Sequence, residues 1–362
     1  MRFTTVRHRQ NPLDLARFFV VFQRVGVYGP RPVLSDPPTD TVAPAPRFDA
    51  DSPLVTCALA ATRAAAVVAA RLAGRGDGHA ADGAATAAMR SVLARSAASG
   101  TVVIGEGAKD EAPMLADGEL VGRAAEPSFD IAVDPLECTD FCARGLAGAL
   151  STIAVAPLDS LWSPGPAFYM DKLVLPRAAR DVATIDEPPE TIVRRVAAAL
   201  SKPVGELRVV VLDKPRHTEL VARLRRLGAA VLTPSAGDVA GALSVLLDDG
   251  DADLLLGIGG TPEGVMSACA ARVLGGGMQA RVAPQRDAER ERVEAAGLSP
   301  TETLDLDLLA GADGAFVATG VTGGELLARP CRRNGSLTTE SLVITAGSVR
   351  RIRQTSPIPN QE

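Results

Sequence analysis

The chain has 362 residues, 46% of them hydrophobic, which is enough to bury the core of one large domain or of two ordinary ones. A net charge of −5 without basic blocks excludes the electrostatic surface of a nucleic-acid-binding protein and a polybasic membrane anchor. Five scattered cysteines form no metal-binding CxxC pair, and no apolar run approaches the roughly 20 residues of a membrane span. We therefore expect a cytoplasmic protein with reduced thiols whose partners are small molecules, not nucleic acid or membrane.

The first 52 residues are predicted to be an irregular extension. Its apolar stretch is interrupted by arginine and glutamine and lacks a cleavage site, which argues against a signal peptide. The proline-rich stretch that follows is typical of a linker. Beyond it, a Ser-Pro start and a final glycine predict a helix over 52–74. Asp82 opens a second predicted helix, over 82–100.

Strands, and then strands alternating with helices, are predicted over the rest of the chain. Segments rich in β-branched residues follow one another as far as about residue 185, where the alternation begins. Alternation favours a doubly wound sheet. We therefore expect an α/β protein with an α+β, metal-binding subdomain over 53–185 and an α/β, substrate-binding subdomain over 186–362. The early strands are 101–105, 129–134, 151–157 and 171–176; the later helices are 189–201, 217–228, 238–247 and 261–276; the later strands are 206–213, 229–234, 251–260 and 314–320, with a hairpin over 336–356.

Carboxylates occur where the predicted strands and helices begin or end. Several acids with few histidine or cysteine neighbours suit oxygen-preferring cations such as Mg²⁺ or Mn²⁺ better than Zn²⁺. The segment "DPLECT" places Asp134 and Glu137 around a proline turn, so that both can face one ion, and Thr139 follows at a distance suited to orienting a water. Taken singly, each acid is more often a surface residue or a helix N-cap. The whole set is Asp82, Glu106, Asp134, Glu137, Asp238 and Glu263.

A second group of residues suits a phosphate. The segment "KPRH" at 214–217 ends a predicted strand and opens a helix, where Lys214, Arg216 and the helix N-terminal amides would bind an anion. Tyr169 and Lys172 are further candidates for this site. The segment "GIGGTPEG" resembles a glycine-rich phosphate loop but has neither the GxGxxG nor the GxxxxGK spacing. The alternatives are a solvated helix start for "KPRH" and a cap or core role for its histidine.

Eleven segments together resemble the class II fructose-1,6-bisphosphatase family of the GlpX type. They occur in the family's order and cover about residues 55–354, which is most of the chain. The resemblance implies the layered fold of the fructose bisphosphatase and inositol monophosphatase superfamily. It also implies hydrolysis of the 1-phosphate of fructose-1,6-bisphosphate by a metal-activated water. The segments are "GRGD..ADGAA", "VVIGEGAKDEAPML", "GELVG", "DIAVDPLECT", "YMDKL", "KPRH", "GDVAGAL", "GIGGTPEGV", "GGGMQAR", "ATGVTGGELL" and "TTESLVI".

The resemblance also implies roles for individual residues and a homo-oligomer, either a dimer or a tetramer. Two or more divalent ions, Mn²⁺ or Mg²⁺, are implied: Asp82 and Glu106 would hold one, and Asp134, Glu137 and Glu263 a second. Asp110, Glu111 and Thr139 match positions associated with activation of the attacking water. Tyr169, Lys214 and Arg216 would hold the phosphate that is not cleaved. The full set of implied substrate contacts is Glu137, Cys138, Thr139, Tyr169, Lys214, Pro215, Arg216, Ala236, Gly237, Asp238 and Gly260.

Four positions depart from the family pattern. Cys138 replaces the glycine of "EGT", Asp140 replaces an arginine, and Ala108 replaces the glutamate after "GEG". Ala236 replaces the first aspartate of "DGDVA", an acid expected to hold sugar hydroxyls, whereas Asp238 remains. Loss of an acceptor for a hydroxyl can shift substrate discrimination by orders of magnitude. The alternative is therefore a GlpX-like phosphatase for sedoheptulose-1,7-bisphosphate, another sugar phosphate or a cyclitol phosphate in a specialised pathway.

Two further interpretations are open at this stage. One is a binding or regulatory protein with a degenerate phosphatase fold, against which the intact set of metal ligands argues. The other is a cysteine phosphatase, because Cys138 and Arg144 fit a CX5R spacing. However, the intervening residues lack the glycines of a phosphate cradle, and the neighbouring acids would raise the pKa of the thiol rather than lower it.

Overall fold

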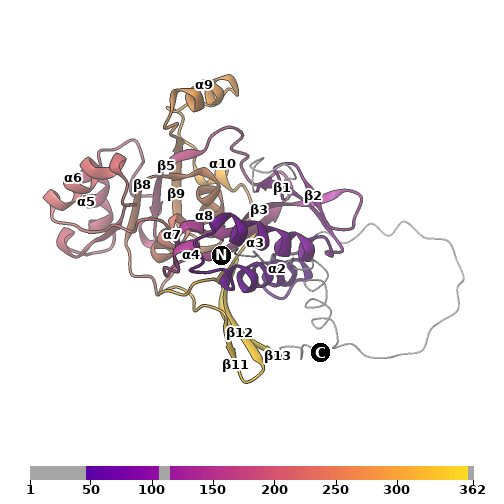
Figure 1. The fold of residues 1–362 in the computed structure, drawn as a ribbon. Coiled ribbons are helices and arrows are strands. Elements are labelled where there is room, and N and C mark those ends of the chain that lie inside the picture. Colours follow the sequence, from indigo (N-terminus) through magenta and orange to yellow (C-terminus); the bar gives the residue numbers. More distant parts are fainter. Residues whose placement is uncertain (1–45, 106–114, 358–362) are drawn as a thin grey trace, which may run out of the picture.

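The computed structural model describes residues 46–105 and 115–357 and contains two mixed β-sheets with helices between and around them (Figure 1). The strands of the first sheet run in the order β11-β12-β10-β4-β3-β1-β2, and the last strand pairs with β12. These strands are β1 (Ser99–Ile104), β2 (Leu120–Val121), β3 (Pro127–Glu137), β4 (Leu150–Pro157), β10 (Ala315–Gly320), β11 (Cys331–Arg333), β12 (Ser336–Thr345) and β13 (Ser348–Pro357). The predicted α/β class is confirmed.

The second sheet has the order β7-β6-β8-β5-β9 and is parallel only in part. Strands β7, β6 and β8 are parallel, whereas β5 is antiparallel to both of its neighbours. The predicted alternation is thus present, but the doubly wound arrangement does not extend across the sheet. The strands are β5 (Tyr169–Leu175), β6 (Arg208–Val210), β7 (Ala230–Leu232), β8 (Leu254–Gly260) and β9 (Gly277–Val282).

Helices separate and cover the two sheets. Helices α2 and α3 lie side by side on the first sheet, α7 and α8 pack between the sheets, and α5 and α6 cover the second sheet's outer face (Figure 1). The apolar side chains of α8 face both sheets, which explains why nearly the whole helix is buried. The helices are α2 (Pro53–Ala70), α3 (Gly78–Leu93), α4 (Thr139–Arg144), α5 (Pro189–Ala199), α6 (Thr218–Leu227), α7 (Asp238–Leu246), α8 (Thr261–Leu274), α9 (Asp287–Ala295) and α10 (Leu306–Leu309).

Strand pairing crosses residue 185 in both directions. Strand β5 precedes this residue but belongs to the second sheet, whereas β10, β12 and β13 follow it and complete the first. The sheets therefore give no boundary at residue 185, and the division into two subdomains there stays a prediction. Residues 1–45, most of the predicted N-terminal extension, lie outside the described residues.

Helix α2 is long and apolar enough to cross a membrane by composition, yet half of it is buried within the protein. It packs against α3 and the first sheet, as a core helix does. Ser52 caps it as predicted, since the hydroxyl accepts a hydrogen bond from the amide of Val55 at 3.3 Å.

The start of α3 differs from the prediction. Asp77, not Asp82, is the N-cap: its carboxylate accepts the amide of Ala80 at 2.9 Å, and the helix begins at Gly78. Both aspartates satisfy the sequence rule for a cap, but the one that follows a glycine turn takes the role. Asp82 therefore lies one turn inside the helix, on a half-buried position.

Candidate active site

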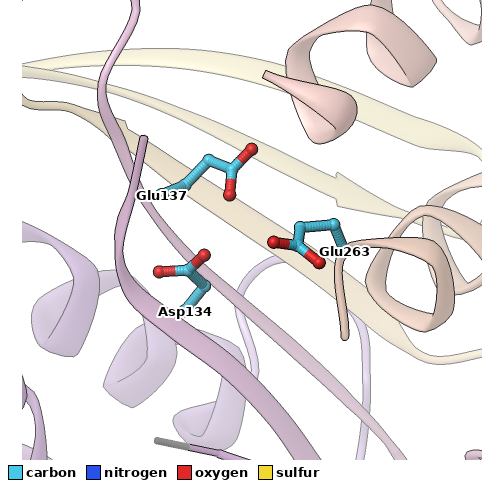
Figure 2. Close-up of side chains that lie close together, drawn as sticks. All are labelled: Asp134, Glu137 and Glu263. Atoms are coloured by element: carbon cyan, nitrogen blue, oxygen red, sulfur yellow. The ribbon is translucent and has the colours of Figure 1, made fainter. Parts of the chain in front are cut away.

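Three carboxylates converge where β3 ends and α8 begins. Oxygens of Asp134, Glu137 and Glu263 lie within 4.8 Å of one another (Figure 2). Asp134 and Glu137 come from β3 of the first sheet, whereas Glu263 lies in the first turn of α8, between the sheets. Glu137 is buried and the other two are half-buried. Glu263 thus joins two acids that precede it by more than 120 positions, and the three form one acidic cluster.

An irregularity in β3 brings the first two acids to the same side. The strand was predicted to end at Asp134, but it continues through Pro135 to Glu137 with a register shift against β4. In a regular strand, residues three apart point to opposite faces; a bulge reverses this relation, and proline is tolerated there because it need not donate to the ladder. Asp134 Oδ1 accepts the amide of Leu136 at 3.0 Å and closes the turn. The bulge, not a strand end, creates the pair.

Burial and the charges of neighbouring carboxylates raise the pKa values of Asp134 and Glu137. Burial is the largest cause for both Asp134 and Glu137; it raises the pKa of Asp134 well above its ordinary range and that of Glu137 to about 7. The charge of Glu263 adds to both shifts. A divalent cation would relieve this repulsion, and an all-carboxylate donor set suits Mg²⁺ or Mn²⁺. The residues present therefore fit a hard cation.

The other predicted metal and water-activating acids are placed only in part. Asp82 on α3 lies close enough for its charge to raise the pKa of Asp134. Glu106, Asp110 and Glu111 lie outside the described residues. Thr139 is half-buried in the first turn of α4, beside the cluster in sequence, and its hydroxyl donates to the carbonyl of Leu136 at 3.0 Å.

The glycines of "GIGGTPEG" make room for acidic side chains. A Cβ on Gly259 would lie 1.7 Å from Oδ2 of Asp238, and one on Gly260 would lie 1.9 Å from Oε2 of Glu263. Such distances are sterically impossible, so each glycine admits one functional carboxylate. The glycines of this segment therefore make room for carboxylates and do not need a phosphate loop to explain them.

His217 is a structural residue, as one of the two sequence interpretations held. The ring is buried, Nδ1 lies 2.8 Å from the carbonyl of Leu212, and Nε2 accepts the amide of Ile258 at 2.8 Å. These partners require a neutral ring with its proton on Nδ1. Burial, the largest cause, lowers the pKa of His217. The side chain ties the "KPRH" segment to β8.

Tyr169 and Arg216, both predicted to hold a phosphate, lie together. The Arg216 guanidinium carbon is 5.1 Å from the Tyr169 ring centroid, and Nη2 donates to the carbonyl of Ile258 at 2.8 Å. Arg216 is exposed, and Lys214 is half-buried at the junction between β6 and a short 3₁₀ helix, Pro215–His217. Three basic or aromatic groups from two elements are thus available to an anion.

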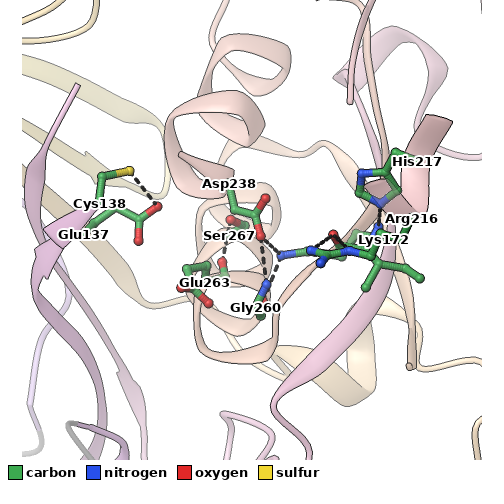
Figure 3. Close-up of polar contacts among 10 residues, drawn as sticks. Glu137, Cys138, Lys172, Arg216, His217, Asp238, Gly260, Glu263 and Ser267 are labelled. Carbon is green, nitrogen blue, oxygen red and sulfur yellow. Dashed lines mark hydrogen bonds and ion pairs between the residues drawn. The ribbon is translucent and has the colours of Figure 1, made fainter. Parts of the chain in front are cut away.

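Lys172 takes a place that its sequence context did not predict. It was a candidate for the phosphate group, but it is 2% exposed and its ammonium contacts Asp238 Oδ2 and the carbonyl of Gly260 (Figure 3). Asp238 is also buried. The sequence offers one indication of such a role, which is a lysine inside an apolar strand of a chain that has few lysines. The sequence does not indicate that Asp238 is the partner of this lysine.

Cys138 lies in the turn after the bulge with a left-handed backbone, φ 63°, the conformation that favours glycine. Its Sγ is 3.8 Å from Oε1 of Glu137. A Cβ on Gly237 would lie 3.7 Å from the same sulfur, so Cys138 also borders the 236–238 loop, where Ala236 is half-buried. The departures at 138 and 236 therefore meet at one place.

The cysteine-phosphatase interpretation is wrong. Arg144 does not curl toward the thiol: residues 139–144 form α4, and Arg144 pairs with Asp140 at 3.2 Å on an exposed surface. Burial and the neighbouring carboxylates raise the pKa of the Cys138 thiol far above its ordinary value, so a thiolate is disfavoured. The same geometry takes Asp140 away from the cluster. All five cysteines are free thiols.

Comparison with known proteins identifies the family. The family described as "Bacterial fructose-1,6-bisphosphatase, glpX-encoded" matches residues 53–356. The chain belongs to this family. Two similar proteins are "Fructose-1,6-bisphosphatase 1 class 2" of Escherichia coli (strain K12) and "Fructose-1,6-bisphosphatase class 2" of Shigella flexneri, each 40% identical over 308 residues, 81% of this chain and 91% of theirs. Membership of the glpX-encoded family confirms the predicted resemblance and makes the chain a phosphoric monoester hydrolase.

Proposed function

We propose that this enzyme hydrolyses the 1-phosphate of fructose-1,6-bisphosphate with the help of divalent cations, Mn²⁺ or Mg²⁺. The observation that carries the proposal is the convergence of Asp134, Glu137 and Glu263 in a member of the fructose-1,6-bisphosphatase family. These three acids would hold one cation, and Asp82 with Glu106 would hold another. When bound, such ions neutralise phosphate oxygens and lower the pKa of a coordinated water.

The chain's own residues would orient the substrate and the water. Asp110 and Glu111 are proposed to accept the proton of the attacking water, and Thr139 to align it. Thr139 is suited to this because its hydroxyl proton is already directed to the carbonyl of Leu136, which leaves its oxygen lone pairs for a water's proton. The cleaved phosphate would lie against the carboxylate cluster.

The retained phosphate would lie at the other end of the substrate. Tyr169, Lys214, Pro215 and Arg216 are proposed to hold it, with the stacked pair of Tyr169 and Arg216 as its rigid part. Between the two phosphates, the sugar would contact the 236–238 loop, Gly260 and the Glu137–Thr139 turn. In this arrangement, charged groups of the protein bind the two phosphates at the ends of the ligand, and hydrogen bonds hold the sugar between them.

A second candidate is a phosphatase of the same mechanism with another substrate, such as sedoheptulose-1,7-bisphosphate or a cyclitol phosphate. The proximity of Cys138 to the loop that carries Ala236 favours this candidate. The two departures from the family pattern, at positions 138 and 236, would both alter the part of the site that contacts the sugar hydroxyls. Asp140, exposed and paired with Arg144, gives this candidate no support.

A phosphate-release screen tests both candidates. The purified full chain is assayed with Mn²⁺ and Mg²⁺ against fructose-1,6-bisphosphate, sedoheptulose-1,7-bisphosphate, sugar monophosphates and cyclitol phosphates, with chelator controls. We expect the highest kcat/KM for fructose-1,6-bisphosphate and formation of fructose 6-phosphate. A higher value for another sugar phosphate would favour the second candidate, and no release from any of them would contradict both.

We also propose that the enzyme acts in the cytoplasm as a homo-oligomer. The free thiols support a reducing compartment, and the family resemblance is the basis for the oligomer. Light scattering of the purified chain measures the oligomer directly, and a monomeric mass would contradict it.

A further inference from the structure

Lys172 is a fully buried lysine with an ion-pair partner that is also buried. Its side chain is 2% exposed and that of Asp238 is 8% exposed. Lysine is almost never fully buried unless it is paired, because removing its charge from water is costly. The chain has few lysines, and this one lies in the middle of β5.

The contacts of Lys172 join three segments of the proposed substrate site. Its ammonium donates to Oδ2 of Asp238, the first residue of α7, and to the carbonyl of Gly260 at 2.8 Å. The amide of Gly260 donates to the same Oδ2 at 3.0 Å (Figure 3). Within the described residues, both hydrogen bonds of the Asp238 carboxylate go to Oδ2. Oδ1 is thus the oxygen left for a hydroxyl.

Packing also restricts the positions of the Lys172 and Asp238 side chains. A Cβ on Gly264 would lie 3.4 Å from Cδ of Lys172, so α8 lies directly against the lysine stem. A Cβ on Gly259 would collide with the Asp238 carboxylate. The ammonium therefore has little freedom to leave its partners and reach a phosphate.

We propose that Lys172 is a positioning residue that holds Asp238 and Gly260 in the arrangement in which they bind the sugar of the substrate. The inference rests on the proposed function, because it needs a sugar phosphate to occupy the site. Lys172 itself does not touch the substrate; it orients the acid and the backbone segment that do. The charge-assisted bonds to one carboxylate oxygen determine which oxygen faces the ligand.

Lys172→Met tests the proposal, since methionine keeps the length and apolar stem but removes the charge. Loss of a partner that orients a metal ligand typically costs roughly 10- to 100-fold in affinity or activity, and we take the same range for a partner that orients a substrate-binding residue. We expect KM for fructose-1,6-bisphosphate at saturating Mn²⁺ to rise by that factor while kcat changes by less than about threefold, because the lost contact binds ground state and transition state alike. Calorimetric binding of fructose 6-phosphate, which needs no turnover, is expected to weaken in parallel.

Lys202→Met is the matched control. Lys202 pairs with Asp253 at 2.6 Å just before β8, at the opposite end of that strand from Gly260. Its loss also breaks a lysine–aspartate pair, but the lysine is 44% exposed, so this variant controls for the removal of a lysine charge and not for its burial. We expect KM and fructose 6-phosphate binding of this variant to stay at the wild-type values.

A double variant tests whether Lys172 acts through Asp238. Because Asp238→Asn by itself removes a proposed contact to the sugar, its own KM is the reference for Lys172→Met with Asp238→Asn. We expect the double variant to regain thermal stability relative to Lys172→Met, because no unpaired charge is buried, and to have a raised KM close to that of Asp238→Asn. A KM that exceeds that of Asp238→Asn by the full factor seen for Lys172→Met alone would show that the two residues act independently and would overturn the proposal. Unchanged KM and binding in Lys172→Met would also overturn it. Failure of the wild-type chain to bind or hydrolyse any fructose phosphate would instead contradict the proposed function, and the inference with it.

Discussion

At the scale of single residues, the site depends on an irregular backbone. Asp134 and Glu137 face one another because β3 bulges at Pro135, and Cys138 then adopts a left-handed conformation that completes the turn. The sequence pattern identified all three positions as unusual. It could not identify the bulge, because a proline after a strand predicts a turn equally well.

Cys138→Gly tests the conclusion that this thiol is not a nucleophile. Glycine removes a left-handed backbone cost of roughly 1–2 kcal/mol and loses the partly buried sulfur, so the free energy of unfolding should change by no more than about 1 kcal/mol. We expect phosphatase activity to be retained. Urea denaturation and phosphate release measure the two quantities; a loss of activity beyond about a hundredfold would revive a thiol mechanism.

At the scale of elements, glycines and one histidine set how β8 meets its neighbours. Gly257, with φ +117°, would bring a Cβ to 2.9 Å from His217 Nε2, so the strand and the "KPRH" segment fit only without a side chain there. Periodicity predicted β8 and α8 well. It could not show which residues of other elements the glycines face, since these partners are distant in sequence.

Gly259→Ala is expected to weaken substrate binding. The added Cβ would lie 1.7 Å from Asp238 Oδ2, so the carboxylate must leave the position in which it accepts hydrogen bonds from Lys172 and Gly260. We expect KM for the sugar phosphate to rise roughly tenfold or more. Gly205→Ala, where a Cβ would be 3.8 Å from its nearest neighbour, is the control and should leave KM unchanged. Equal KM values for the two variants would contradict the proposed place of Asp238.

The neutral state of His217 predicts a pH dependence of stability. Because burial lowers its pKa in the folded state, the unfolded chain binds this proton first as the pH falls. The resulting contribution to the free energy of unfolding is complete above the pKa of histidine in the unfolded chain, about 6.5, and declines below it. Arg216 also lowers this pKa, whereas Asp171 and Asp238 raise it.

We therefore compare the wild type with His217→Gln, which does not titrate and can still accept the Ile258 amide. The wild-type advantage in free energy of unfolding should shrink between about pH 7 and about pH 5. Denaturant titrations at several pH values measure this. A constant difference would show that His217 is not held neutral.

At the scale of the whole molecule, the two sheets are joined by α8, which carries Glu263 and contacts both of them. The fold class and the acids that converge at the end of β3 and the start of α8 could be predicted because they depend on local patterns and on a recognisable family order. The strand order could not be predicted, because residues of β5 pair with residues of β8 and β9 that lie 81 to 112 positions later in the chain. The burial of Lys172 could not be predicted either, because it depends on that strand pairing.

Cation binding should stabilise the whole fold, because the cluster joins β3 of the first sheet to α8, which contacts both sheets. A ligand present at about 100 times its Kd adds about 2.7 kcal/mol to the free energy of unfolding. We expect Mn²⁺ to raise the Tm of the wild type, a chelator to reverse this, and Glu263→Gln to show a much smaller shift. Equal shifts in both proteins would place the cation elsewhere.

Hydrolysis of fructose-1,6-bisphosphate is proposed to depend on the carboxylates of β3 and α8. The most direct measurement is the rate of phosphate release from this substrate as Mn²⁺ is titrated into the metal-free wild type and into Glu263→Gln. We expect no release without cation, saturable release in the wild type, and a loss of roughly a hundredfold or more in the variant at equal Mn²⁺. Release that persists in the presence of a chelator, or that is equal in the two proteins, would contradict this proposal.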